Sequence, residues 1–427
     1  MNTEFDEIRP YNDDEIKQVV EELLHDRQFS RILKGLVPWL PQGVRNFIIR
    51  TAFIGVNSTL DFQMRFMKPV VKYVTHKCAD KVTFDHTGIA PGDERFTFVS
   101  NHRDIVLDSA ILDLLLANAK FPTTCEIAIG DNLLIYPWIK KLVKLNKAFT
   151  VRRGLSPREL MESSQLMSRY MHHAINEKKE NIWIAQREGR AKDSNDRTQE
   201  SVLKMLAMGG EGTPAERLKH LHITPLTISY EYDPCDYLKA MEFQQKRDNP
   251  SFKKSKQDDL DNMKTGIWGK KGHIHYQTAP CINAWIDTLA HLPKAEFFTA
   301  VAQRMDREIH RGYMLFPGNY VALDLLQGNT AHQSHYSAAE KERFEKYIQE
   351  RIDMIKLPNK DVPFLREKLL AMYANPPPVT ISWLHGIGAL RPFTNAGPRT
   401  SPGNTLQRSH PSSCACPTSE TVPQPGQ

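Results

Sequence analysis

Residues 96–116 read FTFVSNHRDIVLDSAILDLLL, and this stretch decides how the rest of the chain is interpreted. Its first four residues, Phe96–Val99, are aromatic or β-branched, which predicts a short strand. From Ile105 onward the residues are apolar on nearly every side of a helix, which predicts a buried helix. His102 lies between the two elements, at the sheet edge where open α/β folds bind ligands. The stretch therefore makes His102 a candidate catalytic residue.

Two acidic residues follow His102 closely. Asp104 and Asp108 are one helical turn apart and so share a helix face. A carboxylate that is hydrogen-bonded to an imidazole fixes the tautomer of the ring and stabilises the imidazolium form. The imidazole can then deprotonate a hydroxyl. Either acid could orient His102 in this way. The alternative is that Asp104 only caps the helix and Asp108 is a buried acid with satisfied hydrogen bonds.

Strands and helices alternate from about residue 80 to residue 232, which predicts an α/β fold with a mostly parallel sheet covered by helices. The predicted strands are 82–84, 96–99, 124–129, 148–151, 181–185 and 223–232. A further strand over 273–277 alternates in polarity like an edge strand. We expect four regions: an N-terminal helical segment (1–75), the α/β domain (76–290), a C-terminal helical layer (291–375) and a disordered tail (376–427) rich in Pro, Gly, Ser and Thr.

Charged residues follow two further strands of the predicted sheet. They are Arg152 and Arg153 after strand 148–151, and Glu188, Gly189, Arg190 and Lys192 after strand 181–185. If the strands are parallel, these residues lie on the same edge as His102. Arginine suits a phosphate because its planar fork gives two parallel hydrogen bonds. Gly189 permits a turn with positive φ, and Glu188 is suited to hold an arginine or a substrate hydroxyl. Ordinary exposed ion pairs are the alternative interpretation.

Four stretches occur in the order seen in the glycerol-phosphate acyltransferase superfamily, which acylates glycerol 3-phosphate and lysophospholipids. They are Asn101-His102 with Asp108, then 148–153 (AFTVRR), 187–192 (REGRAK) and 223–230 (ITPLTISY). The chain resembles this family over roughly residues 80–235. It departs from the usual pattern in two places: five residues, not four, separate His102 from Asp108, and one residue is missing between Gly189 and Arg190.

The resemblance implies acyl transfer with His102 as general base and Asp108 or Asp104 as its orienting acid. Arg152, Arg153, Arg190 and Lys192 would then bind the acceptor's phosphate, with Glu188 and Gly189 shaping their loop. The implied donor is acyl-CoA or acyl carrier protein, and the implied acceptor is glycerol 3-phosphate or its monoacyl form, in phospholipid synthesis. No cofactor or metal is implied. The irregular spacing also leaves open a non-catalytic lipid- or phosphate-binding protein on the same fold.

The composition of the chain bears on where in the cell the protein is expected to act. A mean hydropathy of −0.48 is typical of a globular protein, and a net charge of +6 in 427 residues is no nucleic-acid footprint. The first fifteen residues are acidic and polar, unlike a secretory signal, so we expect a cytoplasmic protein. The implied lipid substrate suggests peripheral attachment to the inner face of the membrane. The segment 44–71, apolar with flanking arginines, could lie on a bilayer surface or pack on its own domain.

Overall fold

The computed structural model describes residues 3–376 except 37–40, 42, 45–50 and 52. The chain divides into two compact units, residues 1–381 and 382–427. The second unit lies outside the described residues, as does nearly all of the predicted disordered tail (376–427). The four predicted regions therefore stay a prediction.

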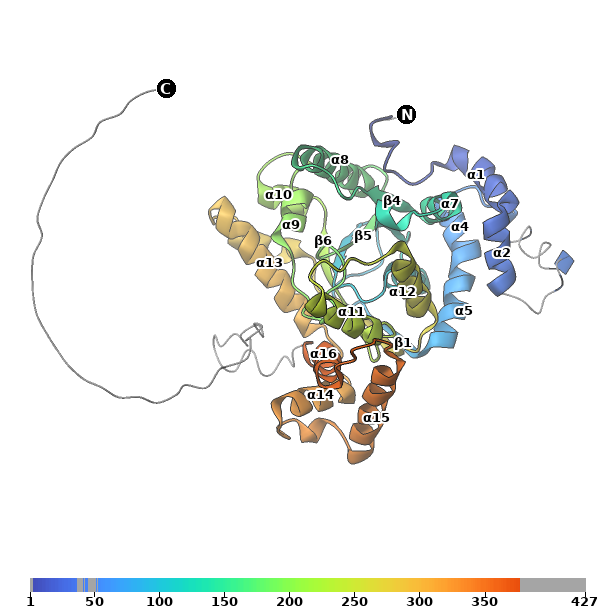
Figure 1. Ribbon diagram of the computed structural model, residues 1–427. Coiled ribbons are helices and arrows are strands. Elements are labelled where there is room, and N and C mark those ends of the chain that lie inside the picture. The colour runs from blue at the N-terminus through green and yellow to red at the C-terminus, as the bar shows by residue number, and fades with distance from the viewer. Residues whose placement is uncertain (1–2, 37–40, 42, 45–50, 52, 377–427) are drawn as a thin grey trace, which may run out of the picture. The chain divides into compact units, whose positions relative to one another are not determined.

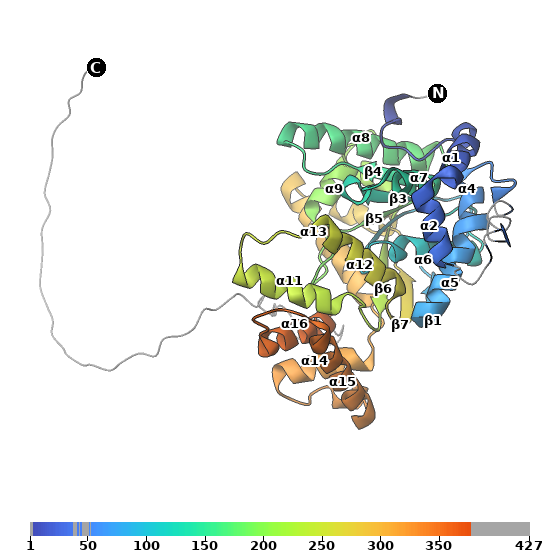
Figure 2. The same cartoon turned by 45° about the vertical axis from the view of Figure 1, so that its right-hand side comes forward.

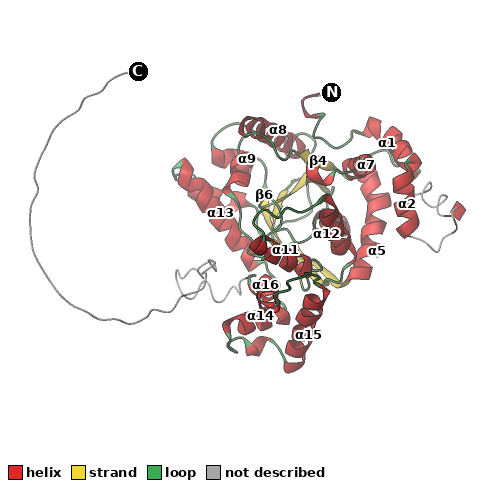
Figure 3. Cartoon of the chain, in the orientation of Figure 1, coloured by secondary structure: helices red, strands yellow, loops and turns green. Residues whose placement is uncertain are grey.

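Within the described residues, a seven-stranded sheet forms the centre of the first unit, in the order β1-β7-β6-β2-β5-β3-β4 (Figures 1 and 3). The strands are β1 (Ala79–Asp85), β2 (Thr97–Ser100), β3 (Cys125–Gly130), β4 (Ala148–Val151), β5 (Asn181–Ala185), β6 (Ile223–Tyr230) and β7 (Gly272–Thr278). β6, β2, β5, β3 and β4 run parallel, whereas β7 is antiparallel to β6 and parallel to β1. The predicted mostly parallel sheet is confirmed.

The prediction that residues 273–277 form an edge strand is wrong. β7 lies between β1 and β6, and the described edges are β1 and β4. Its polar residues alternate for another reason: Nε2 of His273 and Nδ1 of His275 each lie 2.8 Å from the hydroxyl of Thr83 on β1. The polar side chains of His273 and His275 thus have a hydrogen-bonding partner on the neighbouring strand β1. Across the described part of the chain, no group of three or more potential ligands could hold a metal ion.

Helices cover both faces of the sheet, which is why its central strands β2, β5 and β6 are buried on both sides. Val99 and its face pack against α8 (Pro157–Asn176), α9 (Glu200–Leu206), α10 (Pro214–Lys219) and α13 (Lys294–Arg311). Phe98 points to the other face, against α5 (Lys68–Cys78) and α6 (Leu107–Asn118). Figures 1 and 2 show α8, α9 and α13 on the opposite side of the sheet from α5.

Smaller helical groups flank this domain at both ends. The N-terminal group consists of α1 (Asp13–His25), α2 (Arg27–Leu36) and α4 (Thr59–Phe62), with α7 (Pro137–Leu145) packed against it. The C-terminal group consists of α11 (Asp236–Asp248), α14 (Pro317–Gln327), α15 (Ala338–Met354) and α16 (Val362–Ala374) around a core of its own; α14 was not predicted. α12 (Lys256–Trp268) joins α11 to β7.

The segment 44–71, for which the sequence leaves both a bilayer surface and packing on its own domain open, is only partly described. Phe53 and Phe62 are buried inside the N-terminal helical group, so this portion packs on its own domain. Residues 45–50 and 52 lie outside the described part. None of the described helices is long and apolar enough to cross a membrane.

Candidate active site

The chain leaves β2 at a fixed point because Asn101 ties it to the neighbouring strand. The Asn101 amide donates to the carbonyl oxygen of Ile228 on β6 (2.9 Å), and the Ile228 N–H donates back to Asn101 Oδ1 (2.8 Å). Asn101 is fully buried, so both bonds are shielded from water. The next residue, His102, therefore has a fixed backbone position just after the end of β2.

His102 and Asp108 form a hydrogen-bonded pair. Nδ1 of His102 lies 2.8 Å from Oδ2 of Asp108, whose side chain is completely buried. The same oxygen accepts the backbone N–H groups of Arg103 (2.6 Å) and Asp104 (3.0 Å), while Oδ1 accepts the Tyr230 hydroxyl (2.9 Å). An ionised carboxylate only accepts, so this arrangement places the proton of a neutral His102 on Nδ1.

The other nitrogen of the ring, Nε2, makes no hydrogen bond to any described residue. The imidazole packs edge-to-face against Trp183, with 5.4 Å between ring centroids, and its side chain is 15% exposed. The Trp183 indole N–H donates to Ser100 Oγ (3.0 Å), which fixes the aromatic wall in turn. His102 thus presents a fixed, partly accessible acceptor nitrogen, which is what a general base requires.

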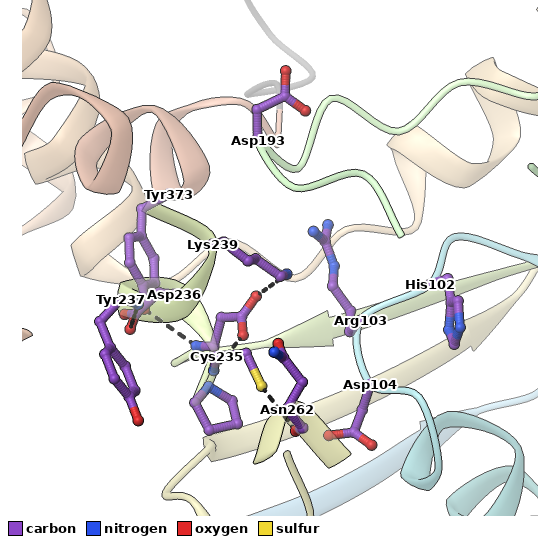
Figure 4. Close-up of polar contacts among 12 residues, drawn as sticks. His102, Arg103, Asp104, Asp193, Cys235, Asp236, Tyr237, Lys239, Asn262 and Tyr373 are labelled. Atoms are coloured by element: carbon purple, nitrogen blue, oxygen red, sulfur yellow. Dashed lines mark hydrogen bonds and ion pairs between the residues drawn. The ribbon is translucent and has the colours of Figure 1, made fainter. Parts of the chain in front are cut away.

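Asp104 has a different position from the one a base-orienting acid needs. Its Oδ1 accepts the backbone N–H groups of Val106 and Leu107, both at 2.9 Å, which fixes the turn that leads into α6; the N-cap residue itself is Val106. Asp104 forms no hydrogen bond with His102, and Figure 4 shows the side chains of His102, Arg103 and Asp104 pointing in three different directions. Burial raises the pKa of Asp104, and the charge of Lys271 opposes this.

His102 and Asp108 can meet although five residues, and not four, separate them, because α6 begins later than the sequence predicts. The apolar run predicts a helix from Ile105, but the helix begins at Leu107. Residues 101–106 form a loop that lets Asp108, in the first turn, meet the imidazole. The irregular spacing is therefore compatible with a formed His–Asp pair.

The predicted phosphate-binding residues divide into paired and unpaired groups. Arg152 is paired with Glu7, Arg153 with Glu188, and Lys192 with Glu242 on α11. Arg190 forms no hydrogen bond or ion pair with a described residue, and neither does Arg187 at the start of the same loop. Both are half-buried. Gly189 between them has φ of +67°, the positive-φ turn that the sequence predicts.

Strand register brings Arg187 and His102 to the same sheet edge. Ser100 at the end of β2 pairs in parallel with Ala185 at the end of β5. Each functional residue follows its strand end by two positions, and neighbouring strands are about 4.8 Å apart. β4, with Arg152 and Arg153, lies two strands beyond β5. Arg187 belongs to the third sequence block but was not predicted to bind phosphate. The signal that could have identified it is its position two residues after a strand end, like that of His102.

The polar loop after β5 is anchored to the domain. Asp196 forms a buried ion pair with Arg103 (2.9 Å). The Thr198 N–H donates to Asp306 on α13 (2.7 Å), and both Asp196 and Thr198 are buried. The loop is thus held from two sides, and its first residues carry Arg187 and Arg190.

Residues 81–229 match the family model described as Acyltransferase. This range contains β2, the His102–Asp108 pair and the loop with Arg187 and Arg190, so the match to the Acyltransferase family covers the candidate site and, up to residue 229, the four sequence blocks. Among solved structures, the chain is similar to the crystal structure of the 1-acyl-sn-glycerophosphate (LPA) acyltransferase PlsC from Thermotoga maritima, with a TM-score of 0.37, 10% identity, and coverage of 69% of this chain and 96% of that chain. No curated protein matched the chain.

Proposed function

We propose that the protein transfers a fatty acyl group from a thioester donor to a hydroxyl of glycerol 3-phosphate or 1-acyl-glycerol 3-phosphate, with His102 as general base. The observation that carries the proposal is the orientation of His102: Asp108 holds Nδ1, and Nε2 is left without a partner among the described residues. Acyl transfer to an alcohol needs such a base. A neutral hydroxyl is a weak nucleophile, and its pKa is too high for it to lose its proton unaided before it attacks a thioester.

In the proposed reaction, the acceptor hydroxyl gives its proton to Nε2 of His102 while its oxygen attacks the thioester carbonyl. The carbon–sulfur bond then breaks, and the leaving thiolate takes the proton back from the imidazolium. Asp108 stabilises the imidazolium between these steps without being protonated itself. No protein residue becomes acylated, and no metal or resident cofactor takes part.

Binding of the acceptor's phosphate is assigned first to Arg187 and Arg190. Both guanidiniums are free of described ion pairs and follow the strand next to His102. Two charge-assisted forks on one phosphate would hold the acceptor hydroxyl near Nε2, which is catalysis by positioning. Arg153, held by Glu188, would extend this positive edge. Arg152 and Lys192 would have to leave their carboxylate partners to take part directly.

The donor is proposed to be acyl-CoA or acyl carrier protein, since both present the acyl group as a thioester. A lipid acceptor and product also fit a protein attached peripherally to the inner, cytoplasmic face of a membrane. The test is transfer of a labelled long-chain acyl group from either donor to glycerol 3-phosphate and to lysophosphatidate. Transfer to at least one acceptor supports the proposal; hydrolysis alone, or no reaction with any of the four pairs, contradicts it.

A further inference from the structure

Arg103 connects the His102–Asp108 pair to a second part of the site. Its backbone N–H donates to Oδ2 of Asp108 (2.6 Å), the oxygen that also holds His102. Its side chain leaves the pair and points toward the loop after β5 (Figure 4). A shift of this residue would therefore move the pair at its backbone end and that loop at its side-chain end.

The Arg103 guanidinium is held in one place by Asp196, Tyr313 and the carbonyl oxygen of Ile228. It lies 2.9 Å from Oδ2 of Asp196, donates to the Tyr313 hydroxyl (3.0 Å) and lies 5.4 Å from the centre of the Tyr313 ring. The Tyr313 hydroxyl donates to the same Asp196 oxygen (2.9 Å), which closes a three-membered network. Burial by itself would lower the pKa of Arg103 and is the largest single influence on it, but Asp196, Tyr313, Asp233 and Asp108 together outweigh burial and raise that pKa above its usual value. The guanidinium is therefore always charged.

Stability alone is a poor reason for this ion pair. Desolvating two charges offsets most of their attraction, and well-packed apolar replacements are often as stable. Oδ1 of Asp196 is also buried without a hydrogen-bond partner among the described residues, which costs further free energy. What the pair does provide is a fixed distance between two loops. One carries the base, and the other carries the guanidiniums of Arg187 and Arg190.

We propose that Arg103 is a positioning residue that, through Asp196 and Tyr313, holds the His102 loop against the loop of Arg187 and Arg190, so that base and acceptor phosphate keep a fixed separation. This inference rests on the proposed function. It also assigns a task to the chain beyond the matched family segment, because Tyr313 lies 84 residues past residue 229.

Arg103→Lys tests the role, because an ammonium keeps the charge but cannot contact Asp196, Tyr313 and the Ile228 carbonyl together as a planar guanidinium does. We expect kcat/KM for the phosphorylated acceptor to fall by about tenfold to a hundredfold, with KM for the acyl donor within about twofold of wild type. Arg351→Lys is the matched control. Arg351 forms a similar, largely buried pair with Asp236 beside two tyrosines, within the C-terminal helical group. It should lower thermal stability similarly and leave both kinetic constants within about twofold.

A double-mutant cycle separates positioning from general loosening of the fold. If Arg103 acts through the loop of Arg190, the losses from Arg103→Lys and Arg190→Ala will not multiply, and the double variant will be within about threefold of the worse single variant. Multiplicative losses, or an Arg351→Lys variant as impaired as Arg103→Lys, would overturn the inference. If Arg103→Lys does not fold, Tyr313→Phe or Asp196→Asn takes its place in the cycle with Arg190→Ala. Tyr313→Phe is expected to lower kcat/KM for the phosphorylated acceptor by about threefold. Failure of the proposed function looks different: wild type then shows no transfer, or His102→Ala is as active as wild type.

Discussion

Nδ1 of His102 lies 2.8 Å from Oδ2 of Asp108, although five residues separate them in the sequence and a second acid, Asp104, stands nearer along the chain. Asp108 is positioned by three further hydrogen bonds, from two backbone N–H groups and from Tyr230. The two acids therefore make different predictions for mutation.

Asp108→Asn should lower kcat by about a hundredfold to ten-thousandfold, because an amide neither stabilises the imidazolium nor enforces the tautomer. The loss is to be measured at saturating donor and acceptor, with circular dichroism as the check on folding. An Asp108→Asn variant with wild-type kcat would remove Asp108 from the mechanism.

Asp104 should matter for stability and not for proton transfer. Asparagine keeps an acceptor oxygen for the same two N–H groups, so Asp104→Asn should keep kcat within about threefold. Asp104→Ala should lower the free energy of unfolding by about 1–3 kcal/mol, because the N–H groups of Val106 and Leu107 lose their acceptor. Urea denaturation and the transfer assay measure the two effects. A large loss of kcat in Asp104→Asn with normal folding would reverse the assignment.

Tyr230 should contribute modestly through Asp108. Tyr230→Phe removes one hydrogen bond to Oδ1, and a bond of about 1 kcal/mol corresponds to about a fivefold loss in kcat. Tyr276→Phe is the control, since the Tyr276 hydroxyl donates to the backbone carbonyl of Asp108 and not to its carboxylate (2.9 Å). Equal losses of kcat in the two variants would show that packing, and not the carboxylate contact, is being measured.

Glu242 should make stability depend on pH in the acid range. Burial favours its neutral form, but hydrogen bonds from Lys192, Lys254 and Lys246 outweigh this and lower its pKa from 4.5 to about 2. A carboxyl with a lowered pKa in the folded state stabilises the fold fully above the unfolded value of about 4.5, and this stabilisation is lost as the pH falls toward 2. The melting temperatures of wild type and Glu242→Gln should differ by a constant amount above about pH 5, and the difference should shrink steadily as the pH falls from there toward 2. A constant difference across that range would contradict the assignment.

Arg190 and Lys192 should differ as phosphate ligands. Lys192 is committed to Glu242, whereas Arg190 has no ion pair among the described residues. Arg190→Ala should raise KM for the phosphorylated acceptor by about tenfold or more, and Lys192→Ala by less than about threefold. Acceptor titrations at fixed donor concentration measure both. The reverse order would place the phosphate nearer α11.

Local pattern was enough to predict most of the sheet and the position of His102 just after a strand. The sequence around His102 predicted a short strand followed by a buried helix, and the structure has β2 and the buried helix α6 there. The place of β7 could not be predicted, because it depends on pairing with β1, about 190 residues away. The choice between Asp104 and Asp108 depended on where α6 begins, and two nearby acids on one helix face leave that undecided. The pairing of Lys192 with Glu242 joins residues fifty positions apart, which no motif encodes.

The most direct test of the central claim is acyl transfer by wild type and His102→Ala, measured side by side with donor binding. The account predicts that His102→Ala lowers the rate at least a thousandfold while its dissociation constant for the acyl donor stays within about threefold. Transfer by His102→Ala at the wild-type rate, or no transfer by either protein while both bind donor and phosphorylated lipid, would contradict a His102-based mechanism. The latter result would favour a binding protein on an acyltransferase fold.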